Sequence, residues 1–214
     1  MKKQINLKEK YIGISGNIGA GKTTFCEKLR KSGFNIYGEP VENNPFLDKF
    51  YNDPKQFAFI MQIFMLTKRY EAVKAIIKNG KKGIQDRTIY EDRIFVSVLY
   101  DKNIIDEDHK KTYENLFSLL SEHIIFPDFL IYLNTEPKTC LERIKKRDRE
   151  CEKPIELSYL ESLHESYEKF IKDISKKIPV FILNEKSQNE DIQKIITNIT
   201  EYYKFNMKPG LVYL

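Results

Sequence analysis

Short runs of apolar residues alternate along the chain with longer stretches in which apolar positions recur every three or four residues. The short runs contain many β-branched residues and predict five strands, at 11–15, 35–37, 83–85, 129–133 and 180–183. The longer stretches predict helices at 22–32, 54–79, 89–101, 108–122, 137–149, 156–176 and 188–204. This alternation is typical of an α/β protein with a central parallel sheet flanked by helices. Residues 1–214 are interpreted as a single domain.

The segment that follows the first predicted strand carries a phosphate-binding motif. Residues 13–25 read GISGNIGAGKTTF and contain the pattern G-x-x-x-x-G-K-[ST] between a buried strand and a helix start. Glycines let the backbone turn tightly, so that successive N–H groups and the helix N-terminus point at an anion. The alternative is a glycine-rich turn without a ligand. The residues predicted to bind the phosphates of a nucleoside triphosphate are Gly16, Asn17, Ile18, Gly19, Ala20, Gly21, Lys22, Thr23 and Thr24.

Charged side chains are expected to gather around this loop. Lys22 supplies a positive charge, and Thr23 offers a hydroxyl to Mg²⁺. Ligands of open parallel sheets bind beyond the carboxyl ends of the strands, and the next two predicted strands end close to Glu39 and to Asp86-Arg87. A carboxylate, an acid–arginine pair and a phosphate cradle in one crevice are what phosphoryl transfer requires.

Composition and charge argue against a membrane protein, a secreted disulfide-rich protein and a zinc protein. No apolar run approaches the roughly 18 residues that cross a membrane, and MKKQ at the start is not followed by the apolar stretch of a signal peptide, so a cytoplasmic location is expected. Three widely spaced cysteines predict neither a disulfide framework nor a zinc site. The net charge of +5 suggests anionic small ligands and does not require a nucleic-acid polymer as a partner.

Taken together, the motifs resemble those of the deoxynucleoside kinases, the family of deoxycytidine, deoxyguanosine and bacterial deoxyadenosine kinases. The resemblance runs from about Tyr11 to Tyr167. It rests on the phosphate loop, Glu39-Pro40-Val41, Met61-Gln62 with Arg69, Asp86-Arg87-Thr88 with Asp92, and the basic segment Arg143 to Arg149 followed by Glu152.

This resemblance implies a single deoxynucleoside kinase domain with the P-loop kinase fold and a helical lid at about 143–153. The implied activity is transfer of the γ-phosphate of ATP, or of another nucleoside triphosphate, to the 5′-hydroxyl of a deoxynucleoside in nucleotide salvage, with Mg²⁺. Members of the family are commonly homodimers, and the segments 54–79 and 89–101 are the candidate surface for such contacts.

The resemblance also assigns roles to the reacting groups, and Glu39, Arg87 and Lys22 are the expected catalytic residues. Glu39 would accept the proton of the 5′-hydroxyl or orient that oxygen. Arg87 would bridge the hydroxyl and the migrating phosphate, and Asp86 would hold Mg²⁺ directly or through water. The alternatives are a solvated acid for Glu39 and a helix-start pair for Asp86 and Arg87.

The lid is implied to fold over the triphosphate and exclude water. A charged helix face without a ligand is the alternative for this basic segment. The implied phosphate-binding arginines of the lid are Arg143, Arg147 and Arg149.

The base of the acceptor is expected to contact the segment 54–79. Gln62, Met65 and Arg69 lie on one face of this predicted helix, either as a base-reading surface or as the edge of the core. The resemblance assigns Gln62 to the base and pairs Arg69 with Asp92. A carboxylate beside the base favours an exocyclic amino group and disfavours thymine, so deoxyadenosine, deoxyguanosine and deoxycytidine are expected, in that order.

Three further residues complete the implied acceptor pocket. Tyr51, eleven residues before Gln62 as in the family, and Glu152 would touch the sugar 3′-hydroxyl. Phe95 would stack on the base, with a buried helix aromatic as the alternative.

Two other functions remain open on the sequence alone. A nucleoside monophosphate kinase such as thymidylate kinase shares the loop, the lid and an Asp-Arg pair, but usually has Glu-Pro-Gly where this chain has Glu39-Pro40-Val41. An inactive, nucleotide-bound interaction subunit of the same fold would be expected to have lost Lys22, Glu39 or Arg87, all of which are present.

Overall fold

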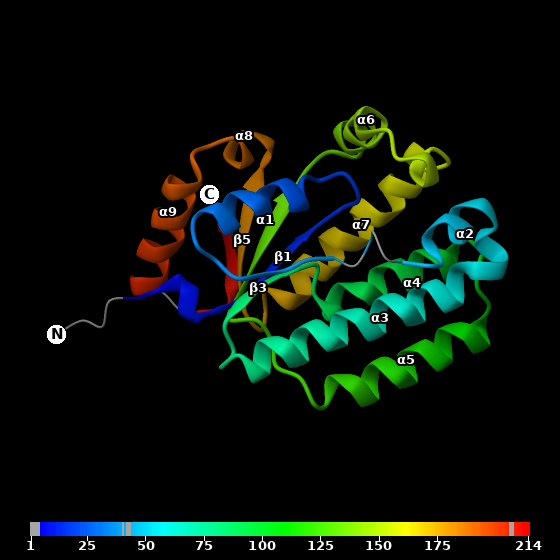
Figure 1. Ribbon diagram of the computed structural model, residues 1–214, viewed down its shortest axis with the longest axis horizontal. Coiled ribbons are helices and arrows are strands. Elements are labelled where there is room, and N and C mark those ends of the chain that lie inside the picture. The colour runs from blue at the N-terminus through cyan, green and yellow to red at the C-terminus, as the bar shows by residue number, and fades with distance from the viewer. Residues whose placement is uncertain (1–4, 40, 42–43, 206–207) are drawn as a thin grey trace.

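A parallel sheet forms the centre of the molecule (Figure 1). The computed structural model describes residues 5–39, 41, 44–205 and 208–214, and within them the sheet has six strands. They are β1 (Tyr11–Gly16), β2 (Ile36–Tyr37), β3 (Gly83–Asp86), β4 (Phe129–Asn134), β5 (Pro179–Asn184) and β6 (Gly210–Tyr213), in the order β2-β3-β1-β4-β5-β6. The predicted α/β class with a parallel sheet is confirmed, whereas the predicted count of five strands is wrong.

Nine helices within the described residues connect and cover the strands. They are α1 (Lys22–Lys31), α2 (Leu47–Asn52), α3 (Pro54–Lys78), α4 (Asp92–Asp101), α5 (Glu107–Ser121), α6 (Pro137–Arg147), α7 (Leu157–Ile174), α8 (Glu185–Gln188) and α9 (Ile192–Phe205). Short 3₁₀ turns stand at η1 (Leu7–Glu9), η2 (Ile89–Glu91) and η3 (Glu150–Glu152). None of these helices is both long and apolar enough to serve as a membrane span.

Two helical regions and one strand depart from the predicted elements. α2 was not predicted, because its six residues bury only Phe50 and are too few to show a helical period. The helix predicted at 188–204 is α9, which begins only at Ile192, after the Asp191 side chain has accepted from the backbone N–H of Gln193 at 2.8 Å. The short α8 before it, capped by Asn184, was not predicted.

The missed strand β6 lies at the edge of the sheet beside β5. Its side chains alternate between half-buried and exposed, and Tyr213 is 75% exposed. A run of four residues of this kind lacks the continuous apolar character of β1, in which all six residues are buried. The pairing with β5 therefore decides the strand, rather than the local sequence.

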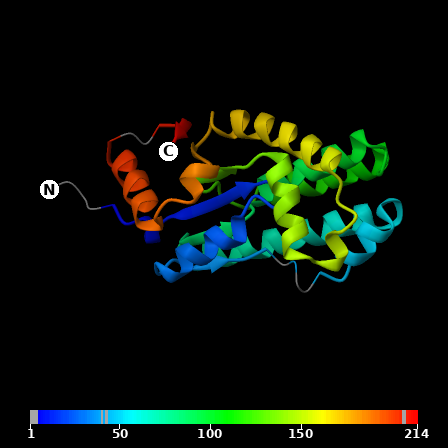
Figure 2. The same cartoon turned by 90° about the horizontal axis from the view of Figure 1, so that it is seen from above.

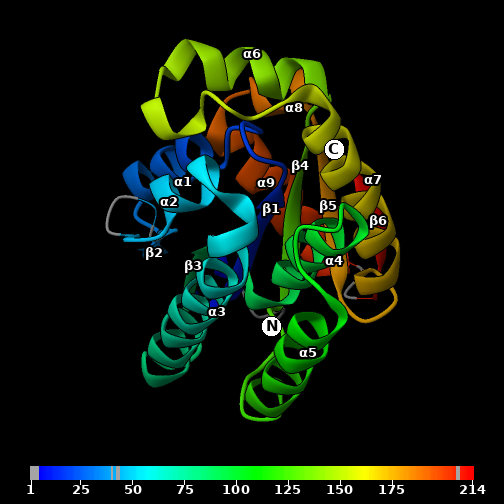
Figure 3. The same cartoon turned by 90° about the vertical axis from the view of Figure 1, so that its right-hand side faces the viewer.

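Helices cover both faces of the sheet. Along β4, Phe129, Ile131 and Leu133 pack in the layer that contains α1 and α9, whereas Leu130 and Tyr132 face α4 and α7. Figure 3 shows α1 and α7 on opposite sides of the strands. A further apolar cluster joins α3, α4 and α5 beyond the second layer. Seen from above, α6 (yellow-green) crosses between α2 (cyan) and α7 (gold), as Figure 2 shows.

The parallel register brings three strand ends to the same edge. Ile14 of β1 lies beside Asp86 of β3, and Tyr37 of β2 lies beside Gln85. β1 continues into the phosphate loop, β2 leads to Glu39, and β3 ends at Asp86. The predicted convergence of these segments at the carboxyl ends of the strands is confirmed.

Candidate active site

A cavity of about 570 Å³ opens at this edge of the sheet. It lies between the phosphate loop, α2, α3, the end of β3 and the segment formed by α6 and η3. The predicted residues that line it are Ile18, Gly19, Gly21, Lys22, Thr23, Thr24, Glu39, Tyr51, Gln62, Met65, Arg69, Asp86, Arg87, Phe95, Arg143, Arg147, Arg149 and Glu152. Four other predicted residues stand behind its wall: Gly16, Asn17, Ala20 and Asp92.

Two glycines give the phosphate loop its shape. Gly19 and Gly21 have φ of 79° and 99°, a region that other residues rarely adopt. A Cβ atom on Gly19 would also stand 2.5 Å from the carbonyl oxygen of Cys140, so the loop packs directly against α6. Both the backbone twist and the close approach therefore require glycine at this position.

Lys22 lies inside the loop rather than in solvent. Its Nζ donates to the carbonyl oxygens of Gly16 at 3.0 Å and Asn17 at 2.8 Å. Burial, together with the charge of Arg87, lowers the pKa of Lys22 to about 8. The ammonium is still mainly protonated at neutral pH and is held where the loop opens into the cavity.

Asn17 and Ala20, which stand behind the wall of the cavity, anchor the phosphate loop to its neighbours. The Asn17 side chain donates to the Leu160 carbonyl of α7 at 2.8 Å and accepts from the Ile18 N–H at 2.8 Å. The Ala20 carbonyl accepts from Arg143 of α6 at 2.9 Å and from Thr135 at 3.2 Å. The loop is thus fixed from two sides before any ligand binds.

Glu39 lies between two arginines. Its Oε1 accepts from Arg69 Nη2 at 2.6 Å and from Arg87 Nε at 3.0 Å. Burial alone would raise the pKa of Glu39, but the charges of Arg87, Arg69 and Lys22 lower it to about 2. Glu39 is therefore a carboxylate at neutral pH, and it faces the cavity that Lys22 also lines. Pro40 of the same motif lies outside the described residues.

Arg87 is held from behind by a network that the sequence did not reveal. The residue has φ of 66°, and its buried guanidinium bonds to the Tyr167 hydroxyl and, at 3.5 Å, to Glu91 Oε2. Glu91 is fully buried and also accepts from Ser15 Oγ at 3.0 Å and from Tyr167 at 2.8 Å. These contacts fix the direction in which the guanidinium points toward Glu39.

Of this network, only the position of Glu91 is indicated by a local sequence pattern. Thr88-x-x-Glu91 is a capping-box pattern, and the backbone N–H of Thr88 indeed donates to Glu91 Oε1 at 2.8 Å. Ser15 and Tyr167 had no such signal, because they reach Glu91 from β1 and α7 across the tertiary structure.

Asp86 has a free oxygen close to Thr23. Thr23 Oγ1 lies 3.5 Å from Asp86 Oδ2, and Oδ1 is buried without a hydrogen-bond partner among the described residues. Burial raises the pKa of Asp86 to about 6, against the lowering effect of Lys22. A buried carboxylate oxygen beside a hydroxyl suits a hard cation such as Mg²⁺, which needs one or two carboxylates together with water and phosphate oxygens.

The base-reading face predicted on α3 turns toward the cavity. Gln62, Met65 and Arg69 are all buried and all line it. Arg69 Nη1 pairs with Oδ1 of Asp92, a fully buried residue at the start of α4. Asp92 therefore acts through Arg69 rather than as part of the wall itself. The Asn44 side chain, which was not predicted to contribute, donates to Met65 Sδ at 3.3 Å and also lines the cavity.

Phe95 lies beside Arg87. The guanidinium carbon of Arg87 is 4.8 Å from the centre of its ring, and the ring meets Tyr167 edge-on. The side chain therefore braces Arg87 as well as forming wall of the cavity.

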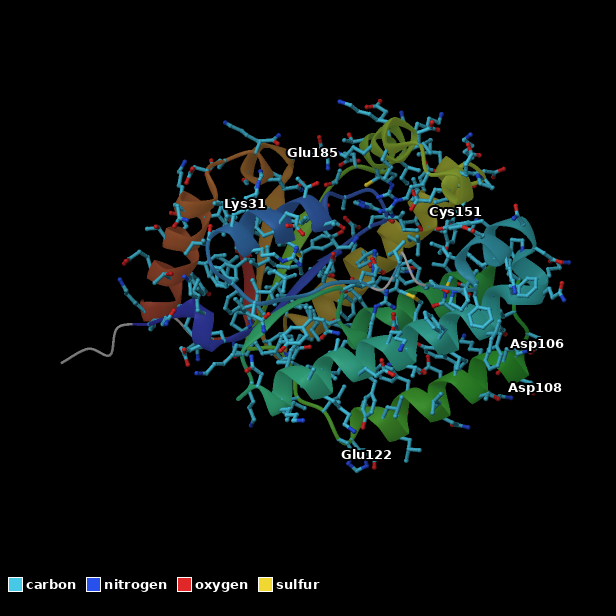
Figure 4. The ribbon with its side chains drawn as sticks, viewed as in Figure 1. Lys31, Asp106, Asp108, Glu122, Cys151 and Glu185 are labelled. Carbon is cyan, nitrogen blue, oxygen red and sulfur yellow. The ribbon has the colours of Figure 1, made fainter. Side chains whose placement is uncertain are left out.

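The lid has two parts with different contacts. Arg143 is tied to the phosphate loop, whereas Arg147 and Arg149, beyond it, both pair with Glu152. Figure 4 places Cys151, the neighbour of Glu152, in the turn between α6 and α7, next to α2. The predicted lid is therefore α-helical only up to Arg147, where α6 ends, and continues through the short 3₁₀ turn η3.

Comparisons with known proteins agree with this geometry. A family model described as "Deoxynucleoside kinase" matches residues 12–204. The chain is 43% identical over 180 residues to the deoxyadenosine kinase of Dictyostelium discoideum, covering 84% of this chain and 74% of that protein. It is 38% identical over 168 residues to the deoxyadenosine/deoxycytidine kinase of Bacillus subtilis, covering 77% of each.

A solved structure shows the same fold. The structure of deoxyadenosine kinase from M. mycoides with bound dATP superposes with a TM-score of 0.80 at 37% identity, covering 88% of this chain and 98% of that one.

Proposed function

The chain belongs to the deoxynucleoside kinase family, and on that premise we propose that it transfers the γ-phosphate of ATP, or of another nucleoside triphosphate, to the 5′-hydroxyl of a deoxynucleoside. The observation that carries the proposal is the shared cavity. Glu39, held as a carboxylate between two arginines, faces the same space as Lys22 of the phosphate loop. An alcohol bound between them has an acceptor on one side and a bound phosphate on the other.

In the proposed reaction the phosphate loop and the lid hold the triphosphate. Backbone N–H groups of the loop and Lys22 face the phosphates, and Arg147 and Arg149 approach from the lid. Arg143 acts mainly by holding the loop at the Ala20 carbonyl.

Thr23 and Asp86 would hold Mg²⁺. The unpartnered Oδ1 of Asp86 fits this role, since a buried carboxylate oxygen without a donor is costly unless a cation compensates it. When bound, the metal would neutralise charge on the phosphates of the donor.

Glu39 and Arg87 are the proposed groups at the reacting oxygen. Phosphoryl transfer is loose, so positioning contributes more than proton abstraction does. Glu39 accepts a hydrogen bond from the 5′-hydroxyl and thereby aims the oxygen at the phosphate. Arg87, fixed by Glu91 and Tyr167, stabilises the charge of the migrating group.

We propose that the acceptor carries an exocyclic amino group, with deoxyadenosine first and deoxyguanosine and deoxycytidine after it. Arg69 lines the cavity and is held by Asp92 from behind the wall, the pair that the family resemblance links to an exocyclic amino group, and Gln62 offers both a donor and an acceptor. Tyr51 and Glu152 are proposed to contact the 3′-hydroxyl, and Phe95 the base.

A coupled assay with four deoxynucleosides and their monophosphates tests this function. We expect turnover of deoxyadenosine above that of thymidine. A nucleoside monophosphate kinase would use the monophosphates instead, and an inactive subunit would use neither. A homodimer and a cytoplasmic location are also proposed, and analytical ultracentrifugation checks the first.

A further inference from the structure

Thr135, the residue that follows β4, joins the phosphate loop to α8. Its Oγ1 lies 3.2 Å from the carbonyl oxygen of Ala20 in the loop and 3.0 Å from Nε2 of Gln188, the last residue of α8. Thr135 is 1% exposed, and α8 lies at the same edge of the sheet as the loop (Figure 1). A buried hydroxyl thus connects the loop after β1 to the helix after β5.

The direction of these hydrogen bonds follows from the chemistry of the groups. Gln188 Nε2 also lies 3.1 Å from the carbonyl oxygen of Leu183, which can only accept, so the Gln188 nitrogen donates to both Leu183 and Thr135. The hydroxyl of Thr135 has one proton to donate. The Ala20 carbonyl is the nearer acceptor at 3.2 Å, since Gln188 Oε1 lies at 3.4 Å. Donation therefore runs from Gln188 through Thr135 to Ala20.

Gln188 is held at its backbone as well as at its side chain. Its carbonyl oxygen accepts from Lys28 Nζ of α1 at 3.3 Å. At the start of α8, the Asn184 side chain accepts from the backbone N–H of Ser187 at 3.0 Å. The donor to Thr135 is therefore fixed by contacts with α1 and β5.

The Ala20 carbonyl decides where the next N–H of the phosphate loop points. A trans peptide is planar, so the carbonyl of Ala20 and the N–H of Gly21 point in opposite directions. Ala20 stands behind the wall, whereas Gly21 lines the cavity. Gly21 has φ of 99°, and glycine also tolerates other values of φ, so this peptide can turn over unless its carbonyl is held.

We propose that Thr135 is a positioning residue for the donor triphosphate: with Gln188 behind it, its hydroxyl holds the Ala20–Gly21 peptide so that the Gly21 N–H donates to a phosphate oxygen. This inference rests on the proposed function and deepens its phosphate site. Arg143 donates to the same carbonyl at 2.9 Å, but from a long, half-buried side chain that loses more rotamer freedom when it is held. The short, buried Thr135 holds the carbonyl at a smaller entropic cost.

Calorimetry on the full chain with inorganic tripolyphosphate and Mg²⁺ tests the phosphate site without a base and without turnover. Thr135→Val keeps the shape of the side chain but lacks the hydroxyl, so we expect Kd for the probe to rise about 5–10-fold, as for the loss of one hydrogen bond to a charged group. Thr135→Ser keeps the hydroxyl and should bind like the unaltered protein. Thr200→Val is the matched control, because the Thr200 hydroxyl donates to the Ile196 carbonyl within α9 at 2.7 Å.

Two further measurements separate positioning from a general loss of folding. Gln188→Met removes the donor behind Thr135 and should weaken binding of the probe less than Thr135→Val does, with no further loss when the two changes are combined. In steady-state kinetics, the KM for ATP should rise in Thr135→Val while the KM for deoxyadenosine stays unchanged. Thermal melting checks that each variant folds.

A lower melting temperature of Thr135→Val with unchanged binding of tripolyphosphate would make Thr135 a purely structural residue and overturn the inference. Equal losses in Thr135→Ser and Thr135→Val, or no binding of the probe to the unaltered protein, would also overturn it. Failure of the proposed function gives a different result: no deoxynucleoside is turned over, while binding of tripolyphosphate still depends on the hydroxyl of Thr135.

Discussion

Arginines stand on both sides of the cavity, but they are held differently on the two sides. We call the side that carries Arg69 and Arg87 the floor; the lid, on the other side, carries Arg147 and Arg149. Arg69 and Arg87 of the floor are 4% and 2% exposed, and each pairs with carboxylates from separate parts of the chain. Arg147 and Arg149 of the lid are 35% and 41% exposed and both pair with Glu152 nearby. The two floor arginines are thus held by buried ion pairs, whereas the two lid arginines lie partly in solvent and share one carboxylate.

The floor forms one chain of alternating charges. Ion pairs join Asp92, Arg69, Glu39, Arg87 and Glu91 in that order, from the start of α4 to the support behind Arg87. Removing Arg69 or Arg87 leaves a buried carboxylate, Asp92 or Glu91, without its cation, which costs about 3–5 kcal/mol, whereas an exposed pair is worth about 0–1 kcal/mol. Changes in the floor should therefore alter catalysis and stability together, and changes in the lid should alter mainly binding.

The largest effect should come from Glu39→Gln. The amide keeps the size of the side chain but cannot act as a proton acceptor or balance two arginines, so we expect kcat to fall by about 10²–10⁴. Steady-state kinetics with deoxyadenosine measure it. Glu122→Gln, at the exposed end of α5 (Figure 4), is the control and should leave kcat unchanged. A loss below about 3-fold would remove Glu39 from the reaction.

The carboxylate of Glu39 should also make the free energy of unfolding depend on pH. The folded pKa of Glu39 is lowered from 4.5 to about 2, so the folded state binds fewer protons than the unfolded state in this range. The stabilisation is complete above pH 4.5 and is lost as the pH falls toward 2. At about 1.4 kcal/mol per unit, it amounts to about 3 kcal/mol at most.

Urea unfolding at several pH values between 7 and 3 tests this. The loss of stability on acidification should be smaller in Glu39→Gln than in the unaltered protein, whereas Glu122→Gln should follow the unaltered protein. Parallel curves for all three would contradict the ion pairing of Glu39.

Replacing the pair Arg69→Met and Asp92→Ala together should change acceptor choice. The double change leaves no buried charge without an opposite charge, because Glu39 keeps Arg87, and it removes the pair that the resemblance links to an amino group. We expect the ratio of kcat/KM for deoxyadenosine over thymidine to fall about 10–100-fold. The pair Arg93 and Glu114, 2.7 Å apart on α4 and α5 with side chains 53% and 30% exposed, is the matched control. An unchanged ratio would show that the base is read elsewhere.

The smallest effect should come from the lid. Arg147→Ala removes one charge-assisted contact to the phosphates, so we expect KM for ATP to rise about 10-fold. The melting temperature should fall only slightly, because Arg147 is partly exposed and the buried Glu152 keeps Arg149 as a partner. Lys146→Ala, the neighbouring exposed residue, serves as the control. A large fall in stability with no change in KM would place Arg147 in the structure rather than in the site.

Much of the site followed from short sequence motifs. The glycine pattern located the phosphate loop, and the positions of Glu39, Asp86 and Arg87 after strands placed them at the same edge of the sheet. Such motifs can be recognised in the sequence because they depend only on neighbouring residues and on strand direction. The support of Arg87 by Ser15, Glu91 and Tyr167 could not be predicted in this way, because it joins residues from β1, η2 and α7.

The sequence by itself determined the alternation of strands and helices, the phosphate loop and the identity of the charged residues around it, because hydrophobic period and backbone conformation are local properties. Only the tertiary structure decided which charges pair, that Asn17 and Ala20 anchor the loop, that β6 joins the sheet, and that Glu152 pairs with Arg147 and lines the cavity. Hydrogen bonds and ion pairs depend on distances of a few ångströms between residues far apart in the chain, and packing alone sets those distances.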